Sequence, residues 1–140
     1  MRFTKLTTTA ITPTRGTAGS AGLDLYAEED TLVSSGASVM LGTGIAIEIP
    51  QGHVGLVAIR SSVGKAGVAL ANSVGVIDSD YRGEIKLCLT YNAGSGGHYI
   101  RKGQAVAQIV IMPVLQVELV EVDALSTTER GAGGFGSTGR

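Results

Sequence analysis

Aromatic residues, cysteine and long apolar runs are scarce in this chain. The 140 residues contain no tryptophan and 4% aromatics against 44% hydrophobic residues overall, so the core must consist of Val, Ile, Leu and Ala. The single Cys88 excludes an intrachain disulfide, and no Cys/His cluster suggests structural zinc. No apolar run is long enough for a signal peptide or a membrane span. We expect a cytoplasmic protein, or a nuclear or organellar one after processing.

An excess of charge of either sign is also missing. Eleven Lys and Arg residues face 12 Asp and Glu residues, for a formal net charge of -1. A broad basic face of the kind that binds nucleic acid or anionic membrane is therefore not expected. Any anionic ligand must be met by a local cluster of positive charge.

Helical periodicity is weak, and period-2 patterns dominate the chain. Residues 45–49 and 85–91 alternate as half-buried strands do, whereas 53–59 and 104–112 are apolar on both faces. Such two-faced strands lie between layers or at a subunit contact. The only helical candidate is 61–67, which contains two glycines. Many short strands joined by glycine-rich turns predict one all-β domain, as a sandwich, jelly roll or barrel.

The composition changes near Ser126, and the chain ends in ERGAGGFGSTGR, residues 129–140. We predict a domain over 1–125 and a flexible glycine-rich arm over 126–140. The arm matches G-x-G-x-x-G, but a dinucleotide site needs a preceding strand, a following helix and a later acidic residue, and only four residues follow Gly136. A Walker A site is not expected either, because no G-K-[ST] follows. Its glycines allow backbone N–H groups to approach an oxyanion, and Arg130 suits phosphate. Phe135 could stack on a base, although a purely disordered tail is the simpler alternative.

Five stretches in order complete the pattern: AGLDLYA (21–27), IRSSVGKAG (59–67), NSVGVIDSDYRGEIKL (72–87), GQAVAQ (103–108) and RGAGGFGSTG (130–139). Together they resemble the five motifs of the trimeric dUTP pyrophosphatases (dUTPases). The resemblance implies a jelly-roll-like antiparallel β-barrel whose flexible arm closes over an active site. It also implies a homotrimer with sites shared between subunits. The expected reaction is Mg²⁺-dependent hydrolysis of dUTP to dUMP and pyrophosphate, which keeps dUTP low and supplies dUMP for thymidylate synthesis.

Asp78 is the candidate catalytic residue. Taken alone, an aspartate in D-S-D-Y is more often a turn residue. A calcium loop is excluded because its fifth and twelfth positions would be Arg82 and Leu89, where oxygen ligands are required. No serine or cysteine has the partners of a nucleophile triad. By the resemblance, Asp78 is the base that directs water at the α-phosphorus.

The resemblance also assigns the rest of the site. Asp24 would hold Mg²⁺ indirectly, through water, and Tyr81 would pack under the deoxyribose. The other expected substrate-binding residues fall into three groups. Those expected to bind uracil are Asn72, Gly75, Val76, Ile77 and Lys86. Those expected to bind the phosphates are Arg60, Ser61, Ser62 and Gly64, with Gln108 supporting the pocket, and those expected from the arm are Arg130, Phe135, Gly136, Ser137 and Thr138.

One departure and two alternatives accompany this assignment. The fourth motif usually has an arginine where this chain has Ala105, so that arginine's contribution is in doubt here. A dCTP deaminase of the same fold would release ammonia, but its usual tail lacks the present glycine-rich string. A non-catalytic β-protein that senses nucleotide is the other alternative, against which an intact Asp78 argues.

Overall fold

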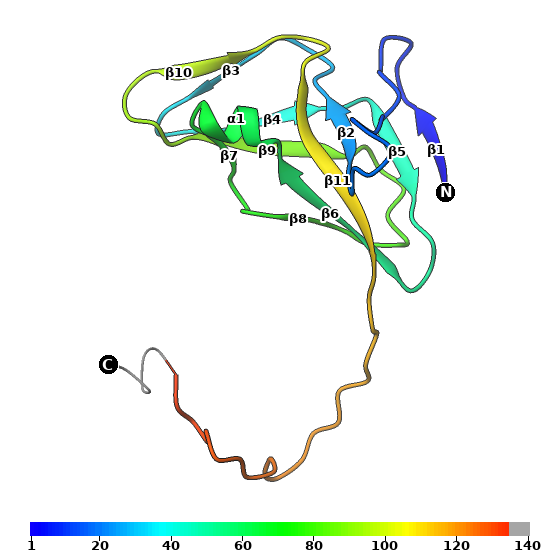
Figure 1. The fold of residues 1–140 in the computed structure, drawn as a ribbon, viewed down its shortest axis with the longest axis vertical. Coiled ribbons are helices and arrows are strands. Elements are labelled where there is room, and N and C mark those ends of the chain that lie inside the picture. Colours follow the sequence, from blue (N-terminus) through cyan, green and yellow to red (C-terminus); the bar gives the residue numbers. More distant parts are fainter. Residues whose placement is uncertain (135–140) are drawn as a thin grey trace.

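The computed structural model describes residues 1–134, almost all of whose regular structure is β-strand (Figure 1). The elements in chain order are β1 Arg2–Lys5, β2 Leu23–Tyr26, β3 Thr31–Ser34, β4 Ser38–Gly42, β5 Ile45–Glu48, β6 His53–Ile59, α1 Ser61–Lys65, β7 Val68–Leu70, β8 Gly75–Ile77, β9 Lys86–Tyr91, β10 Gly97–Ile100 and β11 Ala105–Pro113. The expected strands over 45–49, 53–59, 85–91 and 104–112 are all present, and the weak helical pattern forms one short helix. The all-β prediction is confirmed.

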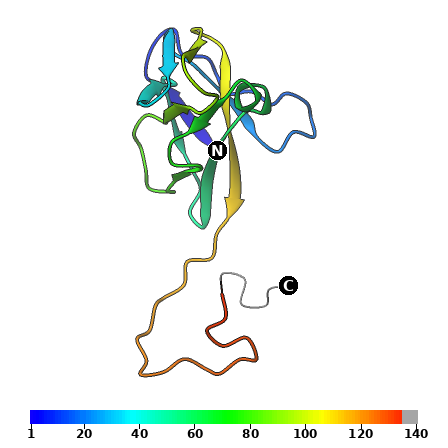
Figure 2. The same ribbon diagram turned by 90° about the vertical axis from the view of Figure 1, so that its left-hand side faces the viewer.

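The strands form antiparallel sheets that face one another. The larger sheet has the order β2-β11-β6-β8 and the smaller one β4-β9-β7, while β1 pairs with β5 and β10 pairs with β3. Figures 1 and 2 show the two main sheets as layers with the short pairs at their margins. Between β4 and β5 the chain passes from one sheet to another through the turn at 42–44.

The core lies between these layers and is aliphatic, as the composition predicts. Leu87 and Leu89 of β9 are buried against residues of the facing sheet such as Leu25, Val57 and Ile109. Full burial of one such side chain stabilises the fold by about 1.5–3 kcal/mol. The alternation in the sequence thus becomes one buried and one outer face for each strand.

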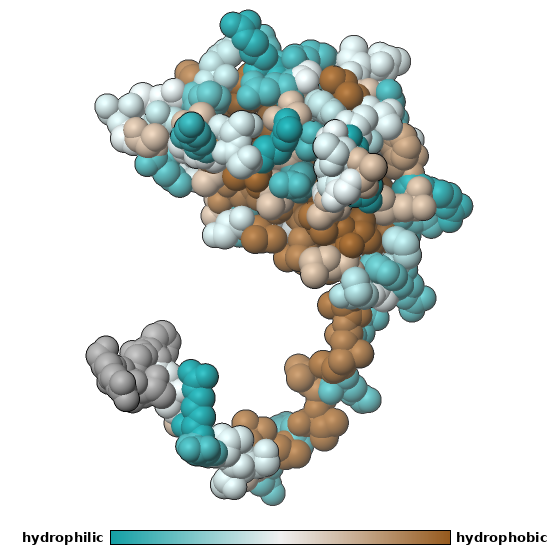
Figure 3. All heavy atoms as spheres, in the orientation of Figure 1, coloured by the Kyte–Doolittle hydropathy of each residue, from teal (hydrophilic) through white to brown (hydrophobic). Residues whose placement is uncertain are grey.

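The larger sheet has an outer face that the described chain leaves partly uncovered. Val110, Leu56 and Val76 pair across β11, β6 and β8 in one row, and Val76 is 62% exposed. Val54 and Met112 form the next row, with Met112 45% exposed. Figure 3 shows apolar side chains gathered on the lower part of the body. The prediction that 53–59 and 104–112 are apolar on both faces therefore holds, and residues 1–134 cover the outer face only in part.

After β11 the chain leaves the body. Val114 still donates its N–H to the Gly52 carbonyl, at 2.9 Å, and residues 114–134 then run away from the sheets in both ribbon views (Figures 1 and 2). Polar and apolar residues alternate along much of 115–123, and Leu115, Leu119 and Leu125 are more than four-fifths exposed. Within residues 1–134, no helix has the length and apolar character to cross a membrane.

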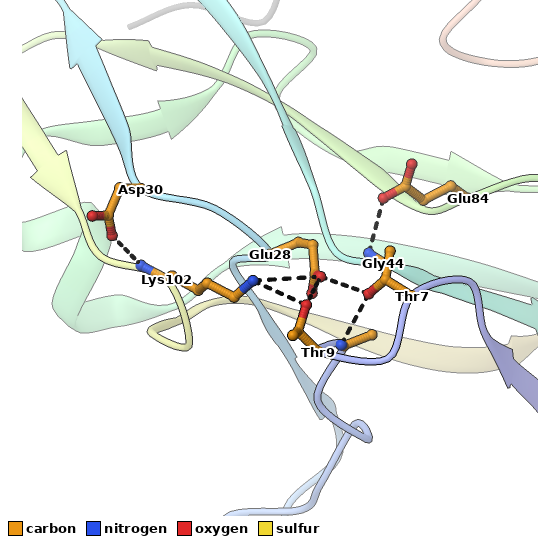
Figure 4. Close-up of polar contacts among 8 residues, drawn as sticks. Thr7, Thr9, Glu28, Asp30, Gly44, Glu84 and Lys102 are labelled. Atoms are coloured by element: carbon orange, nitrogen blue, oxygen red, sulfur yellow. Dashed lines mark hydrogen bonds and ion pairs between the residues drawn. The ribbon is translucent and has the colours of Figure 1, made fainter.

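The N-terminal segment is fastened to the body by Glu28, which follows β2 (Figure 4). Thr7 Oγ1 donates to Glu28 Oε1 at 2.6 Å, Thr9 Oγ1 donates to the same oxygen, and Lys102 Nζ lies 3.7 Å away. The hydrogen bonds from Thr7 and Thr9, with the charge of Lys102, hold the pKa of Glu28 below its ordinary value of 4.5.

Candidate functional site

A polar row crosses the outer face of the larger sheet above its apolar rows. Asp24 on β2 pairs with Gln108 on β11, and Gln108 pairs in turn with Ala58 on β6. A Cβ on Gly22 would lie 2.5 Å from Gln108 Oε1, so the amide lies against that glycine. Two of the expected motifs thus meet at one place, although they are far apart in the sequence, and Ala58 lies just before a third.

Arg60 completes this polar row. Its Nε lies 3.3 Å from Asp24 Oδ1, with the Asp24 side chain 17% exposed and that of Arg60 38% exposed. The Arg60 N–H donates to the Val106 carbonyl at 3.0 Å, which fixes the end of β6 beside β11. A fixed guanidinium with open surface beside it suits a phosphate oxygen.

The short helix α1 follows Arg60 directly. Ser61 and Ser62 are exposed in its first turn, while Val63 is buried and holds the helix on the core. Gly64 donates its N–H to the Arg60 carbonyl at 2.9 Å and is therefore already bonded within the turn. The exposed hydroxyls of Ser61 and Ser62 are available as donors, as are the guanidinium N–H groups of Arg60 other than Nε, which is paired with Asp24.

β8 is the edge strand of the larger sheet. Gly75, Val76 and Ile77 pair with Val57, Leu56 and Gly55 of β6, and no second strand within residues 1–134 pairs with β8. An unpaired edge presents backbone N–H and C=O groups that can read the edge of a planar base.

Asp78 lies in the loop that follows β8. The loop is closed by the Tyr81 N–H, which donates to the Asp78 carbonyl at 3.2 Å, and by Arg82 Nη1, which donates to the carbonyls of Ser79 and Tyr81 at 2.7 and 2.9 Å. Asp78 is exposed and lines an open cleft of about 1040 Å³ together with Arg82, Glu48 and Val114. The carboxylate is therefore accessible to water and to a ligand.

Tyr81 and Lys86 occupy opposite ends of the segment that leads into β9. Tyr81 is 44% exposed, and its hydroxyl donates to the Glu84 carbonyl at 3.0 Å. Lys86 begins β9 and lies 3.5 Å from the Glu84 carboxylate through its Nζ. β8 and β9 belong to different sheets, so residues 75–77 and Lys86 are joined by a loop and not by a paired hairpin.

Asn72 is exposed in the tight turn between β7 and β8. Its carbonyl accepts the Val74 N–H at 2.6 Å, and Ser73 adopts φ 62°, a left-handed conformation unusual for a residue other than glycine. This turn holds the Asn72 side chain outside the sheet.

The candidate site residues form two separate halves within the described chain. One half surrounds Asp24 and Arg60, and the other consists of β8 and the Asp78 loop. Asp24 is level with Ala58 of β6, whereas Ile77, which precedes Asp78, is level with Gly55. Three strand spacings across and three residues along β6 place Asp24 and Ile77 roughly 17 Å apart at the backbone. The described chain therefore does not bring Asp24 and Asp78 onto one phosphate group.

Arg130 belongs to the C-terminal segment, whose described part runs apart from the sheets in Figures 1 and 2. Arg130 Nε donates to the Gly133 carbonyl at 2.9 Å, within a local turn. The other expected arm residues, Phe135, Gly136, Ser137 and Thr138, lie outside the described residues.

Several supporting residues were missed by sequence reasoning. Thr43 is buried, and its Oγ1 donates to the Ile85 carbonyl at 2.7 Å, while Gly44 N–H donates to Glu84 Oε1 at 2.8 Å (Figure 4). These bonds fasten the end of the Asp78 loop to the turn between β4 and β5. Gly83 and Glu84 stand close after Tyr81 in the sequence, but no periodic pattern marks them as residues that support the loop.

The potential metal-ligating side chains of residues 1–134 are too dispersed to form a metal site from protein ligands alone. Within residues 1–134, no three His, Cys, Asp or Glu side chains gather as a metal-binding group. Asp24 is a partly exposed carboxylate beside the Arg60 guanidinium. This donor set fits an ion held largely by water and substrate phosphates, as Mg²⁺ often is.

An antiparallel β-fold with a carboxylate–guanidinium pair, exposed hydroxyls and a separate loop carboxylate has the parts of a nucleotide-phosphate hydrolase. A dUTPase family model matches residues 8–139. The chain belongs to the dUTPase family, and the resemblance drawn from the five motifs is confirmed.

Relatives and solved structures agree with this family. The chain is 45% identical to the deoxyuridine 5'-triphosphate nucleotidohydrolase of Nautilia profundicola, over 100% of this chain and 99% of that protein. It is 47% identical to the enzyme of the same description from a Hydrogenobaculum species, over 96% and 94%. Staphylococcus bacteriophage 80alpha dUTPase bound to dUpNHpp has a TM-score of 0.89 at 27% identity, covering 99% of this chain and 98% of that one. The predicted jelly-roll-like fold is thus that of the family.

A further solved structure concerns metal binding in a related dUTPase. A single-residue mutant of the dUTPase from phage phi11 of S. aureus has a TM-score of 0.81 at 25% identity, over 88% of this chain and 96% of that one. It is described as revealing how a structural Mg(II) ion is coordinated.

Proposed function

We propose that this chain hydrolyses dUTP to dUMP and pyrophosphate by attack of water at the α-phosphorus, keeping dUTP low and supplying dUMP for thymidylate synthesis. Family membership supports the reaction, because the curated relatives are named deoxyuridine 5'-triphosphate nucleotidohydrolases. The observation that carries the proposal is the Asp24–Arg60 pair beside Gln108, with two exposed hydroxyls on the adjoining turn. This is a site for a polyphosphate.

Asp78 is the proposed general base. Its carboxylate is exposed on a loop closed by three hydrogen bonds to backbone carbonyls, so it can accept a proton from a water that attacks the α-phosphorus. As the new phosphorus–oxygen bond forms, the bond from the α-phosphorus to its bridging oxygen breaks. Pyrophosphate then leaves with the electron pair.

Arg60, Ser61 and Ser62 are the proposed phosphate ligands. The guanidinium offers two parallel donors to phosphate oxygens, and both serines present free hydroxyls from a turn anchored by Val63. Gly64 would contribute backbone, and Gln108 would support the pocket from β11. Because this charge is fixed before the substrate arrives, it stabilises the leaving pyrophosphate without rearrangement.

Selectivity for uracil is proposed to come from backbone groups. The open edge of β8 offers the N–H and C=O groups of Gly75, Val76 and Ile77, with Lys86 and the Asn72 amide at either side. Cytosine in the same place would set donor against donor, at about 1–3 kcal/mol for each unpaired group. The Tyr81 ring is proposed to pack under the deoxyribose and to leave no space for a 2′-hydroxyl.

Mg²⁺ is the proposed cofactor. The residue that would hold it is Asp24, indirectly through water, and the ion would offset charge on the triphosphate. Asp24 would keep its ion pair with Arg60 at the same time, since its carboxylate has a second oxygen.

A homotrimer with shared sites is proposed because one chain leaves the site in two halves. The roughly 17 Å between Asp24 and the start of the Asp78 loop is too far for both to act on one α-phosphate, so another copy must supply one half. The outer face with Leu56, Val76 and Met112 adjoins the polar row and needs a cover. Another copy of the chain supplies both the missing half and the cover.

The arm is proposed to complete the site over a neighbouring subunit. The described chain after Val114, which still bonds to Gly52, runs away from the sheets in Figure 1. The boundary at 126 and the closure of 126–140, with Phe135 over the base and Gly136, Ser137 and Thr138 over phosphate, stay predictions. Removal of 129–140 should lower activity strongly and leave the unfolding midpoint unchanged.

The test of the proposed function is pyrophosphate release with Mg²⁺ from dUTP, dCTP, dTTP and UTP. We expect release from dUTP and little from the other three. Ammonia release from dCTP would instead identify a deaminase, and binding of dUTP without turnover would identify a sensor.

Asp78→Asn tests the base. We expect turnover to fall about a hundredfold to ten-thousandfold while dUTP binding persists, because the amide cannot take the proton. Mixed trimers of Asp78→Asn chains with arm-deleted chains should recover part of the activity. No recovery in verified mixed trimers would contradict shared sites.

A further inference from the structure

The Tyr81 side chain folds back onto the two residues that follow Arg82. Its hydroxyl donates to the Glu84 carbonyl at 3.0 Å. A Cβ built on Gly83 would lie 2.6 Å from Tyr81 Cζ and 3.0 Å from Cε2, and would also clash with the hydroxyl oxygen. Gly83 and the Glu84 carbonyl, named here the Tyr81 seat, therefore hold the hydroxyl end of the ring.

Gly83 is a glycine for reasons of space and not of backbone conformation. It is not among the glycines with positive φ, so alanine fits its backbone without strain. An alanine methyl group would have to push the ring by about 1 Å to reach ordinary carbon–carbon contact near 3.5 Å. Because the ring is 44% exposed, it can swing outward, and the chain can still fold.

The seat itself is rigidly fixed to the body (Figure 4). Glu84 Oε1 accepts the Gly44 N–H at 2.8 Å, and the Ile85 N–H donates to the Ile45 carbonyl at 2.9 Å. Thr43 Oγ1 binds the Ile85 carbonyl at 2.7 Å in the buried interior. Glu84 and Ile85 are thus held by residues 43–45, which gives the ring a fixed reference.

We propose that Gly83 is a positioning residue for sugar selectivity: its missing side chain lets the Tyr81 ring lie against the chain at a fixed height. This inference rests on the proposed function, in which the ring packs under deoxyribose. A ring displaced by about 1 Å would either press on the sugar or leave a gap that admits a 2′-hydroxyl. Gly83 therefore acts on dUTP only through Tyr81.

The test is a double-mutant cycle with Gly83→Ala, Tyr81→Leu and the combined variant. Gly19→Ala is the matched control, because a Cβ on Gly19 meets no atom within 4 Å and its φ is also not positive. We measure kcat and KM separately for dUTP and UTP. Gly83→Ala should lower kcat/KM for dUTP by about tenfold to a hundredfold and reduce the preference for dUTP over UTP. In the Tyr81→Leu background the same change should alter kcat/KM less than about twofold.

The contact between Gly83 and the Tyr81 ring can also be tested without substrate. The chain has four tyrosines and no tryptophan, so near-ultraviolet circular dichroism reports mainly on tyrosine surroundings. Gly83→Ala should change that spectrum, but not when Tyr81 is already leucine. The proposal that Gly83 positions Tyr81 would be overturned by an unchanged spectrum or an unchanged preference for dUTP over UTP. It would also be overturned if Gly83→Ala lowered kcat/KM equally with Tyr81 and with leucine at position 81. Absence of dUTP hydrolysis by the unaltered chain would instead overturn the proposed function, and the spectrum would still test the contact.

Discussion

Replacement of Glu28 by glutamine tests the network that fastens the N-terminal segment. The glutamine keeps an oxygen in place of Oε1, which now accepts from Thr7 and Thr9, but it removes the charge facing Lys102. A hydrogen bond to a charged group stabilises by about 1.5–3 kcal/mol and a neutral one by about 0.5–1.5 kcal/mol. With two such bonds in a side chain that is 17% exposed, we expect a loss of about 1–2 kcal/mol at pH 7.

The pH dependence gives this prediction a distinct signature. The pKa of Glu28 is lower in the folded chain than its ordinary value of 4.5, so the stabilisation is fully present above that value. It is lost as the pH falls through the folded-state pKa, because the protonated carboxyl no longer offers charge to Thr7, Thr9 and Lys102. The gap between the unaltered chain and Glu28→Gln should therefore close in acid.

The assay is urea unfolding followed by circular dichroism at pH 7 and at about pH 3.5, at one fixed chain concentration because subunit association adds to stability. Glu29→Gln, on the exposed neighbouring residue, is the matched control and should change little. Equal stability of Glu28→Gln and the unaltered chain at pH 7 would refute the reasoning. So would a difference that persists undiminished in acid.

Three further outcomes are expected. Leu89→Ala, at a fully buried position, should lower the free energy of unfolding by about 3–5 kcal/mol in the same urea assay, and a loss below about 1 kcal/mol would contradict the packing described. Thr43→Val should cost about 1–3 kcal/mol, because the Ile85 carbonyl loses its buried donor; an equally stable variant would show that water replaces the hydroxyl. Arg60→Gln should reduce kcat/KM for dUTP roughly tenfold to a hundredfold in the pyrophosphate assay, with Arg101→Gln as the exposed control. Equal kinetics for both variants would remove Arg60 from phosphate binding.

The strands were predictable because their signal is local. Alternation over 45–49 and 85–91 follows directly from the two faces of an extended chain, and it matches β5 and β9. The five motifs likewise identified the family without any coordinates. The residues expected at the site could be named from those motifs, but not placed relative to one another.

Sheet order and register were not predictable, and they decide the geometry of the site. Asp24 meets Gln108 and Arg60 only because β2, β11 and β6 lie side by side in one register, and a slip of one residue would send their side chains to the opposite face. The same order separates Asp24 from Asp78 within one chain, which is why we infer a site completed by another copy.

The sequence by itself determined the all-β class, the aliphatic core and membership of the dUTPase family, since alternation, composition and motif order are properties of the chain alone. Only the tertiary structure decided that Gly83 makes space for Tyr81 and that Glu28 gathers Thr7, Thr9 and Lys102. It also decided that residues 1–134 leave one face of the larger sheet partly uncovered. Each of these depends on contacts whose distances and directions are set by packing.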